Sequence, residues 1–250
     1  MRLRTAIGAC VAAFIAGFLL DQSGLIERQL TRYNDRVELR KLHAQTIANQ
    51  EWAQKIIEGG YILHIRHAQR ARWRDASAFD VWEARTGVDA SQTDWANATC
   101  LTAQGVEEAK MLGRIFEAAG VEIGAVYSSP ICRARQTAQL AFGDEFEVQN
   151  ELLARTALKP QQRRDYSIAL REFLMTIPIE AGKNTVLTGH GNTISNRQIT
   201  VIDEVRLPAG GERYETGLLV FERRNGRLIA HHHFASLKDF ANAVLEAPNP

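Results

Sequence analysis

Short apolar runs alternate with longer amphipathic stretches along this chain. Apolar runs bounded by Gly, Pro or charged residues are typical of buried strands, and we expect strands at 61–65, 125–127, 185–187, 217–221 and 227–231. The amphipathic stretches predict helices in "LTAQGVEEAKMLGRIFEAAG", "PICRARQTAQLAF", "RDYSIALREFLMTI" and "NTISNRQITVI". Strands that alternate with helices of this length predict an α/β fold, a three-layer α/β/α sandwich with a largely parallel central sheet.

The N-terminus carries an uncharged, mostly apolar run, 5–20, between Arg4 and Asp21. As a helix it would reach about 24 Å, slightly short of the roughly 30 Å hydrocarbon core, so it would span only with snorkelling or local thinning. A cleaved signal peptide is the main alternative, but no A-x-A-like site follows the run. We interpret 1–20 as an uncleaved signal anchor. Because arginines precede the run, the positive-inside rule places the remainder outside the cytoplasm, which in a bacterium is the periplasm.

A polar stretch rich in Gln, Arg and Glu follows the anchor, without Gly or Pro from 25 to 57. It predicts a helical stalk over 21–58, which ends at "EGG". A short apolar stripe, Ile26, Leu30, Tyr33 and Val37, has coiled-coil-like spacing but is not sustained, so it gives only weak support for a dimer. The main domain is therefore expected over 59–250.

Composition adds limits rather than a function. The chain has 250 residues, of which 45% are hydrophobic, and a net charge of +1, which suits one mid-sized domain plus an appendage and gives no reason to expect a nucleic-acid partner. Cys100 and Cys132 lie outside the anchor, and an oxidising compartment would allow them to pair. Two unpaired buried thiols remain the alternative, because a distance cannot be inferred from spacing.

Four polar motifs lie where predicted strands end: "IRHA", "LTAQGVEEA", "SSPICRARQTA" and "LTGHGNT". Open α/β sheets place their ligands at this edge. The motifs supply Arg66, His67, Arg133 and His190. Arginines would repel a metal cation but suit phosphoryl oxygens, so we expect a phosphate site with no metal and no cofactor. An imidazole beside bound phosphate can attack phosphorus and form a phosphohistidine, while arginines neutralise the oxygens.

In the residues of these four motifs and in their order along the chain, 61–236 resembles the histidine phosphatase superfamily, the phosphoglycerate mutase-like group. The resemblance implies that His67 is the nucleophile, that Arg66 and Arg133 clamp phosphoryl oxygens, and that His190 donates to the transferring group. The cysteines beside two motifs are similar to those of a bacterial secreted or membrane-anchored branch, which implies a disulfide between Cys100 and Cys132.

Two departures from the family pattern concern the first motif. The Gly that follows Arg-His in the family is Ala68 here, which adds a methyl group where the backbone approaches ligand. The family Asn shortly after the motif is absent, and Arg70, Arg72 and Arg74 take its place. These arginines extend the anion site or form a solvated loop.

The acid that protonates the leaving group is not fixed by the sequence. Gly191 and Asn192 break the phytase-like pattern of an Asp after the second histidine. Glu151, Glu212 and Glu215 remain candidates. The selectivity for the substrate is expected to lie in 69–98, a long aromatic segment with little periodicity.

The sequence thus predicts a membrane-anchored phosphatase that hydrolyses phosphomonoesters through phosphohistidine. Its expected partner is a phosphorylated small molecule or an envelope phospho-sugar or lipid. A catalytically degenerate module that binds phospho-ligands and a phosphoryl-transfer mutase are the alternatives. The histidines of "AHHHF" are expected to be structural, because only His231 and His233 would point to one face of a strand.

Overall fold

The computed structural model describes residues 34, 36–72, 76–155, 158–191, 193–194, 201–205 and 215–246. Contacts divide the chain into two units, 1–48 and 49–250. The described residues of the first unit are helical, and a helical stretch, 49–58, opens the second. Ala53 and Ile56 are fully buried in the core of the second unit. The end of the predicted stalk therefore contributes to the main domain.

In the part of the chain that the structure describes, no helix has the length and apolarity needed to cross a bilayer. The run 5–20, which the sequence assigns to an anchor, lies outside the described residues. The anchor and the compartment stay predictions.

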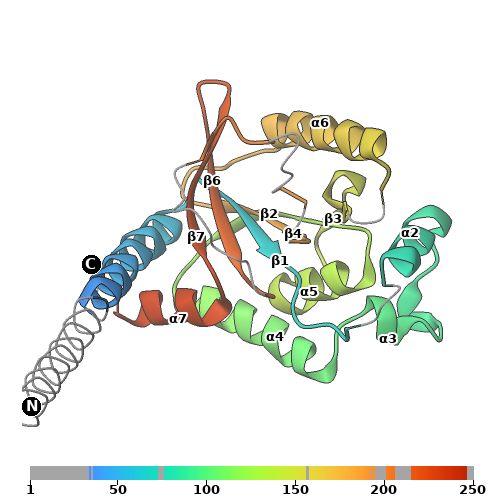
Figure 1. Cartoon of the computed structure of the whole chain (residues 1–250), viewed down its shortest axis with the longest axis horizontal. Helices are drawn as coiled ribbons and strands as arrows, with labels where there is room; N and C mark the ends of the chain where they lie inside the picture. The colour runs from blue at the N-terminus through green and yellow to red at the C-terminus, as the bar shows by residue number, and fades with distance from the viewer. Residues whose placement is uncertain are drawn as a thin grey trace, which may run out of the picture. The chain divides into compact units, whose positions relative to one another are not determined.

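The second unit is built on a sheet whose seven described strands lie in the order β3-β2-β4-β1-β6-β7-β5 (Figure 1). Their bounds are β1 Ile62–Arg66, β2 Ile123–Ser128, β3 Glu147–Val148, β4 Asn184–Gly189, β5 Glu204–Val205, β6 Leu218–Arg224 and β7 Arg227–Phe234. The first four strands of this order are parallel. β6 pairs antiparallel with both β1 and β7, and β5 is parallel to β7. The prediction of a largely parallel sheet is confirmed.

Helices cover both faces of the sheet (Figure 1). They are α2 Ala76–Thr86, α3 Ala96–Thr99, α4 Ala103–Ala118, α5 Cys132–Phe142, α6 Pro160–Thr176 and α7 Leu237–Glu246, with short 3₁₀ turns at Ala90–Gln92 and Asn150–Leu152. Neighbouring residues of a strand point to opposite faces. Leu63 therefore packs in one cluster with Leu112 of α4, whereas Ile62 packs in the other with Leu170 of α6.

The five strands expected from the apolar runs are present, each extended or shifted by a few residues. Thr102 caps α4, since its side chain accepts from the N–H of Gly105. Ile131 caps α5, so this helix begins at Cys132, two residues after the proline. The helix expected over 192–202 lies mostly outside the described residues.

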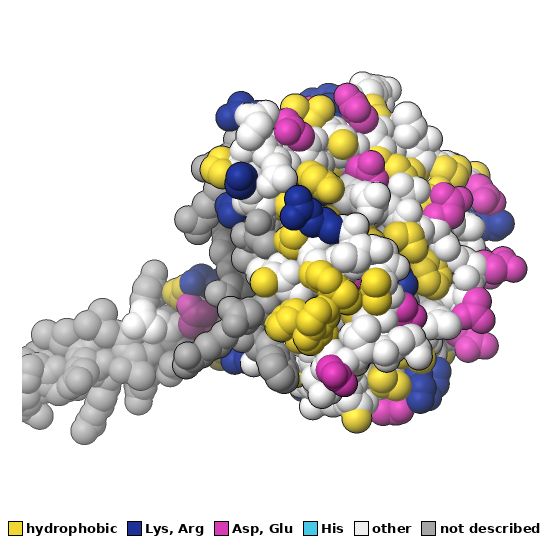
Figure 2. Space-filling view, turned by 90° about the vertical axis from the view of Figure 1, so that its right-hand side faces the viewer, with side chains coloured by type: hydrophobic (Ala, Val, Ile, Leu, Met, Phe, Trp, Pro, Cys, Tyr) yellow, Lys and Arg dark blue, Asp and Glu magenta, His cyan; other side chains and the backbone are white. Residues whose placement is uncertain are grey.

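The segment 69–98 contains helices that its sequence pattern did not indicate. α2 and the start of α3 lie in this segment. Figure 2 faces the side of the molecule that carries α2 and α3, and it shows apolar side chains gathered on the surface. Trp95 contacts Phe79 and Trp82 of α2 at ring centroid distances of 5.4 and 4.2 Å. These aromatic contacts therefore join α2 to Trp95, the residue that caps α3.

Candidate active site

The register of β1 and β4 brings the two predicted histidines together. Arg66 pairs with Gly189 across the parallel strands, and the N–H of His67 donates to the carbonyl oxygen of Gly189 at 2.9 Å. His67 and His190 both follow directly after their strands, and their ring centroids lie 5.3 Å apart. Each side chain is buried, at 3% exposure.

One ring nitrogen of His67 is held by the backbone. Its Nδ1 lies 2.8 Å from the carbonyl oxygen of Ala68. Because a carbonyl only accepts, the proton resides on Nδ1 and the lone pair on Nε2. Burial lowers the pKa of His67 well below 6.5, and Arg133 lowers it further. The imidazole is therefore neutral at physiological pH, with Nε2 as the atom able to attack.

Two side chains fix the tautomer of His190. Arg133 Nη2 lies 3.3 Å from His190 Nδ1, and Ser129 Oγ lies 3.0 Å from Nε2. A guanidinium only donates, so Nδ1 accepts and Nε2 carries the proton toward Ser129. Burial, followed by Arg133, lowers the pKa of His190 well below 6.5. In this arrangement the single N–H of His190 is already engaged by Ser129.

Arg133 lies in the same buried cluster, but its fork is occupied. Asp80 of α2 accepts from Nη1 and Nη2 at 2.7 Å each, and the carbonyl oxygen of Thr99 accepts from Nη1 at 3.4 Å. The sequence predicted Arg133 as a phosphoryl clamp and gave no indication of Asp80.

Arg66 and Glu215 border the histidines. A Cβ on Gly191 would lie 3.5 Å from Cδ of Arg66, so the Arg66 side chain extends along the loop after β4. The N–H of Thr216 donates to the Arg66 carbonyl at 3.1 Å, and Arg66 Nη2 lies 3.9 Å from Glu215 Oε1. Arg66 also contributes to the lowered pKa of His67. The structure thus places Glu215 beside the predicted site.

The other predicted acids are placed differently. Glu151 lies in the 3₁₀ turn after β3, and its backbone carbonyl accepts from Arg155. Glu212 lies outside the described residues. Among the extra arginines, Arg70 is half-buried and contributes to the lowered pKa of His67, whereas Arg72 is exposed. Arg70 therefore belongs to the electrostatic surroundings of His67.

The "LTAQG" motif holds the loop that follows His67. The N–H of Thr102 donates to the Gln69 carbonyl at 3.1 Å, and Glu108 Oε2 accepts from the Gln69 N–H at 3.0 Å. A Cβ on Gly105 would collide with the same carbonyl oxygen, so only glycine permits this approach. Ala68 is fully buried, and its N–H donates to Thr137 Oγ1 at 3.0 Å. These contacts therefore hold both residues that follow His67.

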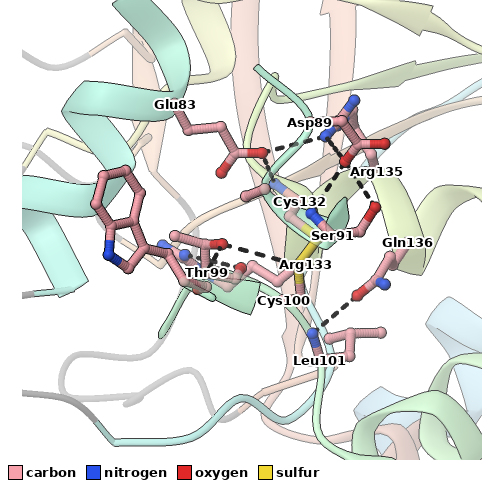
Figure 3. The surroundings of a disulfide bond; sticks show 12 residues. Glu83, Asp89, Ser91, Thr99, Cys100, Leu101, Cys132, Arg133, Arg135 and Gln136 are labelled. Atoms are coloured by element: carbon pink, nitrogen blue, oxygen red, sulfur yellow. Dashed lines mark hydrogen bonds and ion pairs between the residues drawn. A yellow bond between two sulfur atoms is a disulfide. The ribbon is translucent and has the colours of Figure 1, made fainter. Parts of the chain in front are cut away.

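A disulfide joins Cys100 to Cys132, next to Thr99 and Arg133 (Figure 3). It joins the residue after Thr99 to the residue before Arg133. The N–H of Cys132 donates to Glu83 Oε1 at 2.9 Å, and Arg135 Nη2 lies 3.1 Å from the same oxygen. Burial raises the pKa of Glu83 to about 7, against the lowering effect of this N–H and of Arg135.

Two histidines of the "AHHHF" run make side-chain contacts within the second unit. His231 Nε2 contacts Glu222 Oε2 at 2.7 Å, and His232 Nε2 contacts Asn49 Oδ1 at 2.9 Å. His64 is fully buried in β1. The described residues contain no group of three or more His, Cys, Asp or Glu placed to hold a metal ion.

The sequence missed several contributors to the site. Ser129 and Thr137 lie within the "SSPICRARQTA" motif and were not singled out, although their hydroxyls suit hydrogen bonds to a buried imidazole and amide. Asp80 and Glu83 belong to a segment without clear periodicity, so no pattern in the sequence indicated that their carboxylates turn inward.

Part of the chain matches a known protein family. Residues 62–155 match the family model of the histidine phosphatase superfamily, branch 1. No curated protein gives a match. Among solved structures, the chain is similar to the protein histidine phosphatase SixA complexed with tungstate, at 15% identity over 70% of this chain and 96% of that one, with a TM-score of 0.43.

Two further solved structures are similar to the chain at the same level. One is the phosphoserine phosphatase from Entamoeba histolytica in complex with 3-phosphoglyceric acid, at 15% identity, 72% and 98% coverage and a TM-score of 0.43. The other is Rv3214 from Mycobacterium tuberculosis, at 14% identity, 69% and 95% coverage and a TM-score of 0.43. The family match, to the histidine phosphatase superfamily, covers residues 62–155, the part of the chain that contains Arg66, His67 and Arg133.

Proposed function

We propose that this protein is a phosphatase that hydrolyses phosphomonoesters through a phosphohistidine at His67. The observation that carries the proposal is the pair of neutral, buried imidazoles next to Arg66 and Arg133. A neutral imidazole can act as a nucleophile without first losing a proton. In His67 the Ala68 carbonyl engages Nδ1, so the lone pair of Nε2 is available for attack.

The chemistry proceeds in two displacements. His67 Nε2 forms a bond to phosphorus as the bond from phosphorus to the ester oxygen breaks, and the leaving oxygen takes a proton. Water then attacks the phosphohistidine, which releases inorganic phosphate and restores the imidazole. Arginines neutralise the phosphoryl oxygens in both steps, so the reaction needs no metal.

Glu215 is our choice for the group that protonates the leaving oxygen, because it borders Arg66. Of the three acids predicted from the sequence, it is the one with a described side-chain contact to a site residue. The predicted anchor and the resemblance of the cysteines to those of secreted members favour a substrate outside the cytoplasm, such as an envelope phospho-sugar or lipid phosphate. The membrane anchor at 1–20 belongs to this proposal.

The test is a screen of phosphomonoesters with the full-length chain in mild detergent, with and without a chelator. We expect the protein to hydrolyse at least one ester, at a rate that the chelator does not change. Phosphate binding without hydrolysis of any ester would instead identify a binding module, and transfer to a second hydroxyl compound in preference to water would identify a mutase.

A further inference from the structure

The carboxylate of Asp80 and the guanidinium of Arg133 form a buried ion pair at the edge of the candidate site. Both contacts are 2.7 Å long, and the residues are 6% and 3% exposed. The pair joins α2, which the sequence did not predict, to α5, which carries the phosphate motif. Arg133 can therefore bind a ligand only through N–H groups that Asp80 does not occupy.

Most N–H groups of Arg133 already have an acceptor. A guanidinium has five N–H groups, two on each Nη and one on Nε. Those of Nη1 meet Asp80 Oδ1 and the Thr99 carbonyl, and those of Nη2 meet Asp80 Oδ2 and His190 Nδ1. The Nε atom is buried and has no hydrogen-bond partner among the described residues. All four fork hydrogens are thus taken.

A phosphoryl group and a carboxylate compete for the same fork. Both present paired oxygens that match two parallel N–H groups, and two anions cannot share the same hydrogens. Thr99 and His190 are neutral partners, so Asp80 is the partner whose charge a phosphoryl group can replace. We propose that Asp80 holds the phosphoryl-binding edge of Arg133 in the empty site and yields it to the substrate, so that Asp80 sets the affinity for phosphate. The inference rests on the proposed phosphatase function.

A second cation stands near the carboxylate that would be released. The pKa of Arg70 is lowered by burial and by Arg133, and Asp80 acts against both, which places Asp80 within electrostatic reach of Arg70. A buried charge that loses its partner is strongly destabilising. Arg70 is able to compensate Asp80 when Arg133 turns to the phosphoryl group, so the exchange leaves neither charge alone.

The experiment measures binding of inorganic phosphate to the full-length wild type and to Asp80→Asn, by inhibition of turnover and by thermal shift. Asparagine keeps the shape of the side chain but removes the competing charge. We expect phosphate to bind at least about tenfold more tightly to Asp80→Asn and to raise its melting temperature more than that of the wild type. Equal or weaker binding would overturn the proposal, since it would mean that Asp80 only positions Arg133.

Asp203→Asn is the matched control. Asp203 pairs with Arg171 at 2.8 Å on a half-exposed surface outside the candidate site, so its loss should leave phosphate binding unchanged. If Asp80→Asn folds only in the presence of phosphate, the anion is replacing the carboxylate and the proposal holds. If it stays unfolded at saturating phosphate, the proposal fails.

A structure of the wild type with bound phosphate gives an independent readout. We expect a phosphoryl oxygen to replace at least one of the two contacts between Asp80 and Arg133. Retention of both contacts beside a bound phosphate would overturn the inference. Phosphate binding without turnover of any ester would contradict the proposed phosphatase function. The thermal shifts of the wild type and of Asp80→Asn with phosphate would still decide the role of Asp80.

Discussion

The imidazole of His67 is oriented by the carbonyl oxygen of Ala68, the residue that follows it, at 2.8 Å from Nδ1. This contact uses the backbone of the motif itself, so it does not depend on a distant side chain. It fixes the tautomer that leaves Nε2 free. The methyl group of Ala68 is compatible with this contact, and the N–H of Ala68 donates to Thr137 Oγ1.

The lowered pKa of His67 predicts an unusual tolerance of acid. Burial and Arg133 hold the imidazole neutral well below pH 6.5, so the nucleophile is not lost as the pH falls through that value. We expect the rate of phosphoenzyme formation, measured in single-turnover experiments, to stay level from about pH 8 down through pH 6.5. A decline with its midpoint at pH 6.5 or above would show that His67 titrates as an exposed histidine.

The raised pKa of Glu83 predicts that the folded protein loses stability as the pH rises. Its pKa is raised from 4.5 to about 7 in the folded protein, so the folded state binds the proton more tightly than the unfolded state. The associated stabilisation is complete below pH 4.5 and is lost as the pH rises through 7. Glu83→Gln, which does not titrate, should therefore gain on the wild type by up to about 3 kcal/mol above pH 7.

Melting temperatures of both proteins between about pH 5 and pH 8 check this prediction. The gap in favour of Glu83→Gln should widen as the pH rises. A gap that is the same at every pH would mean that the carboxyl of Glu83 is not perturbed by burial.

The disulfide should support both stability and activity. It closes a loop with a sequence separation of 32 residues, which predicts a loss of about 3 to 4 kcal/mol in unfolding free energy when it is removed. Because Cys132 precedes Arg133 and Cys100 follows Thr99, the double variant Cys100→Ser, Cys132→Ser should also raise KM.

Chemical denaturation of the double variant and of the wild type with and without reductant measures this effect. Reductant should destabilise the wild type and leave the double variant unchanged. An equally stable reduced wild type would show that the two cysteines contribute only as buried thiols.

The sequence predicted the parts of the site that a strand pattern can reveal. His67 and His190 follow apolar runs, and strands that pair in parallel bring their ends to one edge, so the convergence of the two histidines follows from local sequence. Arg133 was found because it lies in the first turn of α5, shortly after the end of β2. The core could be predicted for the same reason.

The rest depended on contacts that local sequence does not encode. α2 has apolar and polar residues on no consistent face, because Asp80 and Glu83 turn inward to arginines while Phe79 and Trp82 pack on Trp95. Buried carboxylates reverse the usual relation between polarity and exposure. The ion pair that occupies Arg133 therefore became visible only in three dimensions.

The most direct test of the account is to trap the phosphoenzyme. The full-length protein is mixed with a substrate from the phosphomonoester screen and quenched in alkali, which preserves phosphohistidine, and the phosphorylated peptide is identified by mass spectrometry. His43→Ala serves as a control, because His43 is an exposed histidine of the first unit. We predict phosphate on His67 in the wild type and in the control, and neither label nor turnover in His67→Ala. Turnover by His67→Ala at the rate of the wild type would contradict the mechanism.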